Sequence, residues 1–173
     1  GAQDFNQSPY QDFFMASPVV ADFNGDTLPD VLGIQFFTTP NRIVLQLNHN
    51  TGSIGFSEQD LGLNLDAYGQ PAAADMDGDG DMDVLVSVGV NYDIFILRND
   101  GNAYFTPDSL GVSGAFVLKA GDLDNDGDMD IIGINTDNND LVICPNDGAQ
   151  HFTKWVVPGF DNLEYLSLND MDN

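Results

Sequence analysis

Three short stretches of the chain carry aspartate or asparagine at alternate positions: ADFNGDTLPDVLG (21–33), ADMDGDGDMDVLV (74–86) and GDLDNDGDMDIIG (121–133). Counted from the first aspartate of each stretch, oxygen-bearing side chains fill positions 1, 3, 5 and 9. Alternate side chains of a tightly curled loop can converge on one centre, and hard oxygen donors are the ligands that Ca²⁺ takes. The pattern therefore predicts one calcium site in each loop. The expected ligands are Asp22, Asn24, Asp26 and Asp30 in loop 1; Asp75, Asp77, Asp79 and Asp83 in loop 2; and Asp122, Asp124, Asp126 and Asp130 in loop 3.

Position 7 of each loop holds Leu28, Asp81 or Asp128, and we expect it to add a backbone carbonyl, a role that tolerates the varied side chain. A fourth copy begins at Asp170 and includes Asp172, so it offers only part of a ligand set. Calcium is favoured over magnesium, which keeps its waters and uses few protein ligands. Zinc and copper would require histidine or cysteine, which the loops lack.

Two other calcium motifs and one metal-free reading are weaker explanations of the loops. An EF-hand is rejected because position 12 is Gly33, Val86 or Gly133 instead of a bidentate glutamate. The glycine-rich nonapeptide repeat is rejected because the period here is far longer. The loops could also be Asp-Gly turns with no bound metal. Three copies with oxygen donors at the same positions favour calcium.

The loops belong to an internal repeat of about 50 residues. A second marker recurs at the same spacing of about 50 residues. It is a phenylalanine in the sequences GSIGF, GNAYF and GAQHF. These markers are Phe56, Phe105 and Phe152, with Phe5 as an earlier member. We therefore expect residues 1–173 to form a single repeat array, a partial propeller, with loops at 22–30, 75–83 and 122–130 and an incomplete fourth loop from 170.

Each repeat contains the pattern of four short strands. A β-branched run follows each aspartate loop, then a second apolar run, a turn signal (NTG or NDG), a strand near the phenylalanine and an apolar stretch that enters the next loop. No segment keeps a helical apolar period, so helix should be scarce. The expected fold class is all-β, built of propeller blades of four antiparallel strands, with about three complete blades and partial ones.

The nine-residue loop entering a β-branched strand resembles the FG-GAP/VCBS-type repeats of calcium-binding β-propellers, which include the head of integrin α chains and many secreted bacterial proteins. The resemblance implies that each loop joins the innermost strand of a blade to the next strand, that the residues named above bind Ca²⁺, and that a complete propeller has about seven blades. Loop 1 departs from the family pattern, with Thr27 in place of the usual glycine at position 6 and Asn24 in place of a carboxylate. We expect about three complete sites, with loop 1 the weakest.

The composition narrows the partners. The chain has four lysines and arginines in total and 28 acidic residues, which gives a formal net charge of −24. We therefore expect no binding to nucleic acid or to anionic membranes. The sequence contains no run of 18 apolar residues, so it predicts no membrane span. The single cysteine allows no intrachain disulfide, so we expect bound metal ions to cross-link the chain and stabilise the blades. Because millimolar free calcium is an extracellular condition, the expected location is extracellular, either secreted or at the cell surface.

Function beyond calcium binding has several readings. The favoured one is an extracellular module for adhesion or for binding a protein or glycan ligand, with Ca²⁺ mainly stabilising the blades. The alternatives are a structural subunit of an extracellular fibre, coat or adhesin, and, less favoured, a non-catalytic part of a secreted enzyme. Tyr68, Tyr92 and Trp155 could stack on sugars, although packing between blades is the favoured role for each.

We expect no catalytic activity, because His49 and His151 occupy different places in their repeats and the paired carboxylates are committed to metal. About three blades cannot close a ring of seven. The chain is therefore expected to be a slice of a longer polypeptide or, as the alternative, to assemble from copies that complete one another's blades.

Overall fold

The computed structural model describes residues 15–35, 42–48, 56–63 and 65–168. Within these ranges every regular element is a strand and no helix occurs. The strands are β1 (Met15–Ala21), β2 (Asp30–Gln35), β3 (Arg42–Asn48), β4 (Phe56–Asp60), β5 (Ala67–Ala74), β6 (Asp83–Val88), β7 (Asp93–Asn99), β8 (Phe105–Ser113), β9 (Val117–Gly121), β10 (Asp130–Asn135), β11 (Asp140–Cys144) and β12 (Trp155–Val157). The all-β fold class is confirmed.

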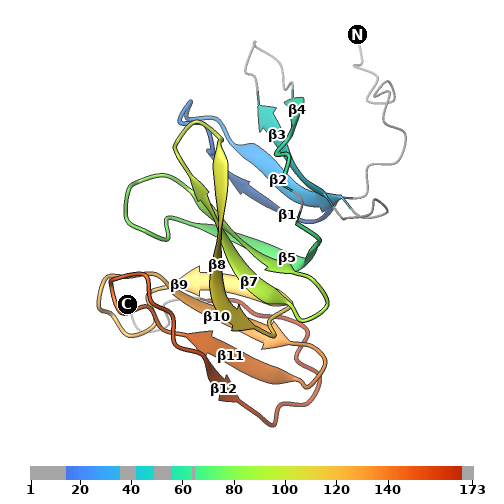
Figure 1. Ribbon diagram of the computed structural model, residues 1–173, viewed down its shortest axis with the longest axis vertical. Coiled ribbons are helices and arrows are strands. Elements are labelled where there is room, and N and C mark those ends of the chain that lie inside the picture. The colour runs from blue at the N-terminus through green and yellow to red at the C-terminus, as the bar shows by residue number, and fades with distance from the viewer. Residues whose placement is uncertain (1–14, 36–41, 49–55, 64, 169–173) are drawn as a thin grey trace.

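The strands form three antiparallel units of four in chain order, which we call blade 1 (β1–β4), blade 2 (β5–β8) and blade 3 (β9–β12). The three blades follow one another along the long axis of the molecule (Figure 1). Blades 2 and 3 share one sheet of eight strands because their first strands, β5 and β9, pair in parallel at Gln70 and Val117. Two blades joined at their innermost strands are compatible with part of a β-propeller.

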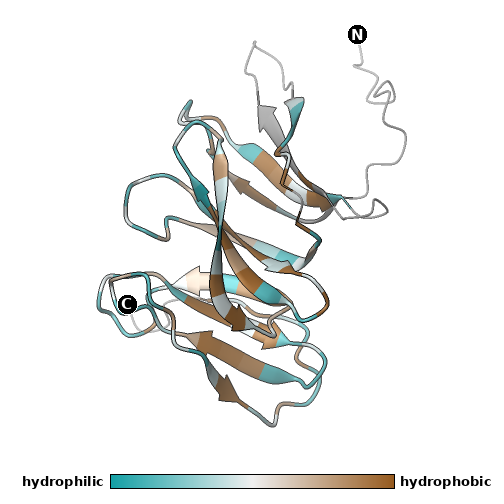
Figure 2. Cartoon of the chain, viewed as in Figure 1, coloured by the Kyte–Doolittle hydropathy of each residue, from teal (hydrophilic) through white to brown (hydrophobic). Residues whose placement is uncertain are grey.

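The core lies between the blades. In β6, Val84 and Val86 pack against blade 1, in one cluster with Phe23 and Leu32. The intervening Leu85 packs in a second cluster with residues of blade 3, including Leu118, Ile131 and Val142. Successive side chains of a strand point to opposite faces, so a strand covered on both faces has a nearly continuous apolar sequence. This burial explains the run DVLV, and Figure 2 shows hydrophobic residues along the strands and hydrophilic residues in the loops.

The marker phenylalanines sit where the fourth strand meets the third. Phe56 pairs with Asn48, and Phe105 pairs with Asn99, each at the start of its strand. In blade 3, Phe152 instead forms an isolated bridge with Asn146, and β12 begins only at Trp155. An asparagine at the end of the third strand (Asn48, Asn99) or just beyond it (Asn146) therefore pairs with the phenylalanine in all three blades.

Candidate metal centre

Each aspartate loop connects the innermost strand of a blade to its second strand, as the family resemblance implied. The two strands pair directly at the base of the loop, through Ala21 and Asp30, Ala74 and Asp83, or Gly121 and Asp130. Position 9 of the loop is thus the first residue of the second strand. Its side chain is held by the sheet itself, whereas the earlier positions belong to the connecting loop.

The aspartate at position 1 curls the loop around its own carboxylate. In loop 2, Asp75 Oδ1 accepts hydrogen bonds from the backbone N–H groups of Gly78 (2.8 Å) and Asp79 (3.2 Å), and its Oδ2 accepts one from Gly80 (3.0 Å). Asp22 and Asp122 accept equivalent bonds from positions 5 and 6 of their own loops. Backbone donors around one carboxylate give the loop a fixed shape before any ion binds.

The aspartate at position 9 is buried and ties the loop to the blade. Asp83 Oδ2 accepts the N–H of Met76 at position 2 (3.1 Å), and its Oδ1 accepts the N–H of Asn99 at the end of β7 (2.8 Å). Asp130 is bonded in the same way by Leu123 and Asn146, both at 2.8 Å. A carboxylate that begins a strand and accepts backbone N–H groups from two other segments has a fixed position, so position 9 provides a rigid oxygen donor.

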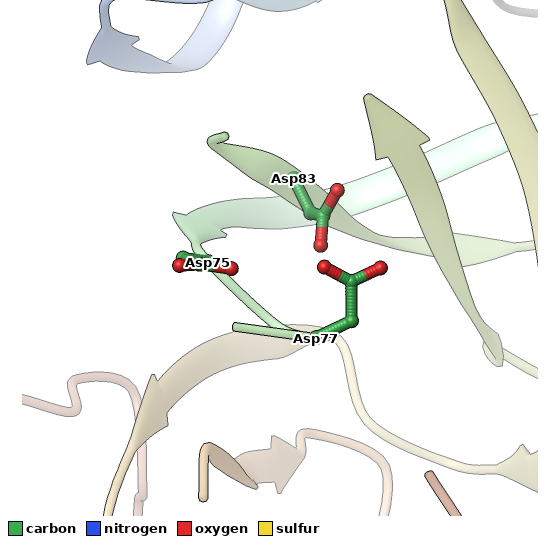
Figure 3. Close-up of side chains that lie close together, drawn as sticks. All are labelled: Asp75, Asp77 and Asp83. Atoms are coloured by element: carbon green, nitrogen blue, oxygen red, sulfur yellow. The ribbon is translucent and has the colours of Figure 1, made fainter. Parts of the chain in front are cut away.

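Positions 1, 3 and 9 converge in loops 2 and 3. Asp75, Asp77 and Asp83 each offer a carboxylate oxygen within 4.8 Å of the others, and Asp122, Asp124 and Asp130 do the same. Figure 3 shows Asp77 and Asp83 facing each other, with Asp75 beside them on the adjoining strand end. Carboxylate oxygens at these separations can share one cation. The structure thus brings together three of the four side chains expected in each of these two loops.

Positions 5 and 7 lie outside these groups of three. The position 5 carboxylates accept the backbone N–H of position 7: Asp79 Oδ1 accepts that of Asp81 (2.9 Å), and Asp126 Oδ1 accepts that of Asp128 (3.0 Å). The side chains of Asp81 and Asp128 rest on the turn after the third strand, where a Cβ on Gly101 or Gly148 would lie 2.5 Å and 2.6 Å from them. At position 7 only the backbone carbonyl therefore stays a predicted ligand.

The gathered carboxylates repel one another. Burial raises the pKa of Asp83 to about 6, although the N–H groups of Asn99 and Met76 and the Arg98 guanidinium favour its ionised form. Burial and then the neighbouring carboxylates, first that of Asp79, raise the pKa of Asp81. The pKa of Asp124 is raised by the same two causes. A bound cation would favour the ionised carboxylates and so offset both their burial and their mutual repulsion, which is the electrostatic situation expected of a cation site.

Loop 1 has the same frame with weaker ligands. Asp30 is buried and accepts the N–H of Phe23 (3.0 Å), as position 9 does in the other loops. Position 3 brings no negative charge because it is Asn24, whose side-chain amide donates to Asp26 Oδ2 (3.3 Å). Thr27 has a φ of 69°, a conformation that a β-branched residue adopts at a cost. Both departures noted in the sequence support the prediction that loop 1 is the weakest site. Leu28 donates its N–H to Asp26 Oδ1 (2.9 Å).

The fourth copy cannot be compared with the other three, because Asp170 and Asp172 lie outside the described residues.

Sequence reasoning missed the residues that brace the loops from elsewhere in the fold. Asn99 and Asn146 are buried, and their backbone N–H groups hold the position 9 aspartates. The next blade also reaches loops 1 and 2, because Phe23 O accepts the N–H of Ala103 (2.9 Å) and Met76 O accepts the side-chain amide of Gln150 (2.8 Å). The Asn that opens each NDG turn signal was the available signal, and it was interpreted only as part of a turn.

The donor set fits a hard divalent cation. The ligands on offer are carboxylate oxygens, with a backbone carbonyl at position 7, and Ca²⁺ accepts six to eight such oxygens in flexible geometry. Asp75, Asp77 and Asp83 in loop 2, and Asp122, Asp124 and Asp130 in loop 3, would hold it. Its chemistry there is to neutralise the carboxylates and cross-link the loop.

The family model of the FG-GAP-like repeat matches residues 22–86, from the first aspartate of loop 1 into β6. This segment, which contains loops 1 and 2, is an FG-GAP-like repeat, and the predicted resemblance is confirmed there. No curated protein and no solved structure matches the chain. In the part of the chain that the structure describes, no helix is long and apolar enough to cross a membrane. The match over this segment and the sheet of four-stranded units support a β-propeller repeat module.

Proposed function

We propose that this FG-GAP-like repeat chain is an extracellular calcium-binding β-propeller module in which Ca²⁺ stabilises the blades and one surface binds a protein or glycan ligand. The observation that carries the calcium part is the convergence of carboxylates from positions 1, 3 and 9 at the same place in two successive blades. A single acidic cluster is common on protein surfaces. The same trio built twice on the same strand connection supports a cation site.

Calcium would act on stability. An ion that binds only the folded state adds about 2.7 kcal/mol at a hundredfold excess over its dissociation constant. Sites in all three loops would together add about 8 kcal/mol, comparable with the roughly 5 to 15 kcal/mol stability of a typical domain. Loops 1 and 2 also contact the next blade through the carbonyl at position 2, so an ion that orders either loop also supports the interface between blades.

Thermal unfolding with and without calcium tests this role. We expect the unfolding temperature to fall by roughly 10 °C or more when millimolar Ca²⁺ is replaced by a chelator. The Asp77→Ala/Asp124→Ala variant should lose most of the calcium response. The Asp93→Ala/Asp161→Ala variant removes the same charge at exposed positions outside the loops and should keep it. An unfolding temperature that ignores the chelator would contradict the proposal.

The ligand-binding part is supported by aromatic side chains at the surface. Trp155 on β12 is 59% exposed, so it does not pack between blades as the sequence suggested. Tyr68 and Tyr92 are half-buried, with their rings 6.5 Å apart in an edge-to-face contact, and Tyr92 meets Phe116 in the same way. These two tyrosines pack as expected. Exposed aromatic rings such as Trp155 suit stacking on a sugar or insertion into a protein partner.

A glycan and matrix-protein array, run in millimolar calcium and repeated with chelator, tests the ligand. Binding to one ligand class that requires calcium, and that Trp155→Ala weakens, would support an adhesion or lectin module. A blank array from a folded, calcium-loaded sample would contradict the ligand-binding part and leave the calcium part standing.

A structural role is the second candidate, and one observation favours it. At position 2 of the loops, Phe23 and Met76 are 0% and 1% exposed because the next blade covers them, whereas Leu123 is 41% exposed. A further blade would cover Leu123, whether it comes from a longer chain or from another copy of this one. Self-association at micromolar concentration, measured by analytical ultracentrifugation and weakened by Leu123→Asp, would support a building block of an extracellular fibre or coat.

A non-catalytic role and an extracellular location complete the proposal. The carboxylates that could act as acid and base are the same ones that would hold the ions, and His151 is an exposed residue paired with Asp147 at 3.1 Å. Calcium reaches the millimolar level outside cells, which is where sites of modest affinity would be filled. The strongly acidic surface supports a partner other than nucleic acid or anionic membrane.

A further inference from the structure

Loop 2 already has a positive charge beside it. Arg98 is the next-to-last residue of β7, and its guanidinium lies at the loop, with Nη1 3.3 Å from Asp77 Oδ2 and 3.8 Å from Asp83 Oδ2. The side chain is 19% exposed, so water screens it only in part. Asp77 and Asp83 are two of the three carboxylates in the loop 2 group. Arg98 therefore contacts two of the carboxylates that a metal ion would use.

The other half of the guanidinium is held elsewhere. Nη2 of Arg98 donates to Gln150 Oε1 (2.7 Å), in blade 3, and lies 3.5 Å from Asp108 Oδ2, on the adjoining strand β8. Gln150 in turn donates to Met76 O in loop 2 (2.8 Å). Arg98 thus has partners on both sides, and releasing Asp77 and Asp83 would leave it paired with Asp108 and Gln150.

We infer that Arg98 is a built-in counter-ion of loop 2 that competes with the divalent cation for Asp77 and Asp83, so that loop 3 fills at lower calcium concentration than loop 2. This inference rests on the proposed calcium binding. In the metal-free protein Arg98 offsets the repulsion between the carboxylates and keeps loop 2 ordered. Calcium binding at loop 2 then requires the Nη1 contacts to be given up.

Loop 3 provides the internal comparison. The residue that corresponds to Arg98, immediately before the buried asparagine, is Pro145. Among the described residues, no lysine, arginine or histidine forms an ion pair with Asp122, Asp124 or Asp130. Two loops with the same three carboxylates therefore differ in one charge. Repeat proteins make such comparisons direct, because the surrounding frame is shared.

Calcium titration of loop-specific variants tests the competition. Asp124→Ala disables loop 3, so that loop 2 gives the tighter of the two remaining binding events. In this background Arg98→Gln should tighten that event by about tenfold, as expected for removing a charge a few ångströms from the ion. In the Asp77→Ala background, where the tighter event reports loop 3, Arg98→Gln should leave the affinity of that event unchanged within about twofold. Lys154→Gln removes a positive charge that contacts Ser113 instead of a loop and serves as the matched control.

Arg98→Lys separates charge from shape. It keeps the positive charge and should leave the loop 2 affinity near that of the parent, even where Arg98→Gln folds poorly. A loop 2 affinity that Arg98→Gln leaves unchanged or weakens, or that Arg98→Lys tightens as much as Arg98→Gln does, would overturn the inference.

Stability without calcium gives a second readout. Arg98→Gln should lower the unfolding temperature in chelator, and this deficit should shrink or reverse in saturating calcium. A merely structural arginine would lower the unfolding temperature equally in both conditions, and that result would overturn the inference. If neither loop binds calcium in the parent protein, the proposed function itself fails, and this is seen before any Arg98 variant is made.

Discussion

The aspartate at position 9 differs from the other loop carboxylates because its side chain is buried. Asp30, Asp83 and Asp130 each begin a second strand and accept a backbone N–H from position 2 of their own loop. The same side chain is thus a structural tie and a candidate ligand. Protonating or replacing it should affect folding and calcium binding together.

The pKa of Asp83, which burial raises to about 6, makes calcium binding at loop 2 sensitive to acid. The carboxylate must lose its proton before it can bind the ion. At about pH 5 roughly nine in ten Asp83 side chains are protonated, so the proton competes with Ca²⁺ for this carboxylate. In the Asp124→Ala protein we expect the calcium affinity of loop 2 to fall about tenfold between about pH 7.5 and pH 5, as measured by calorimetry. Equal affinities at the two pH values would contradict this.

The same shift affects the metal-free protein in the opposite sense. The folded-state pKa of Asp83 lies above its ordinary value of 3.8, so the folded state binds the proton more tightly. The stability that this proton contributes is fully present below about pH 3.8 and is lost as the pH rises through about 6. Calcium should therefore matter most for stability at neutral pH, where Asp83 is ionised.

Thr27 is the second residue whose effect can be predicted. It occupies position 6 of loop 1 with a φ of 69°, where loops 2 and 3 have Gly80 and Gly127, both with a φ of 98°. A left-handed conformation costs an L-residue about 1 to 2 kcal/mol, so Thr27→Gly should raise the free energy of unfolding by up to about 1 kcal/mol in chelator. Chemical denaturation measures this change.

The matched control is the reverse exchange. Gly127→Thr places a threonine at position 6 of loop 3 and should lower the free energy of unfolding by about 1 to 2 kcal/mol. Two substitutions that change stability in the same direction would show that φ at this position does not decide the outcome.

Among the elements, the junction of the innermost strands β5 and β9 depends on a close backbone approach. Gln70 donates its N–H to Phe116 O (2.8 Å), and Gly69, with a φ of 76°, lies so near that a Cβ would sit 2.0 Å from the same oxygen. The strand β5 has an irregular register at this point, between Tyr68 and Ala72. Only glycine fits there, because any side chain would push blade 3 away from blade 2.

Gly69→Ala should therefore destabilise the protein by about 3 kcal/mol or more, measured by urea denaturation. Gly62→Ala is the control, because Gly62 has a similar φ of 65° but no atom within 4 Å of its Cβ position. Gly62→Ala should lower the free energy of unfolding by only about 1 kcal/mol, the cost of the left-handed backbone conformation. Equal losses at the two positions would argue against a steric role for Gly69.

For the whole molecule, the net charge of −24 opposes compaction. Monovalent salt screens this repulsion, so the unfolding temperature in chelator should rise when NaCl is increased from about 10 mM to about 300 mM. Saturating calcium neutralises part of the charge at its densest points and should make the salt response smaller. A response of the same size with and without calcium would show that the loops contribute little to the repulsion.

The same scale explains why the blades need one another. Blade 2 buries one face of β6 against blade 1 and the other against blade 3, and it has no apolar centre of its own in either cluster. In such an array each unit is stabilised by its neighbours. The exposed Leu123 shows where the described array lacks a neighbour on its blade 3 side.

The amino-acid sequence by itself determined the repeat, the four strands of each blade and the place of the aspartate loops between the first two strands. These features follow from local chemistry: alternation of apolar residues, turn residues before glycine, and oxygen donors at fixed spacing. The strain expected at Thr27 was also visible, because the glycines of the other loops occupy the same position.

Tertiary structure alone decided which oxygens meet and what surrounds them. Positions 1, 3 and 9 converge, while position 5 turns to the backbone, since the curvature of the loop depends on hydrogen bonds that spacing does not specify. Arg98 reaches Asp77 across 21 residues of sequence, and Gln150 reaches Met76 across 74. Contacts between residues so far apart depend on how the blades pack, and no local pattern around Arg98 distinguishes a loop counter-ion from an ordinary strand residue.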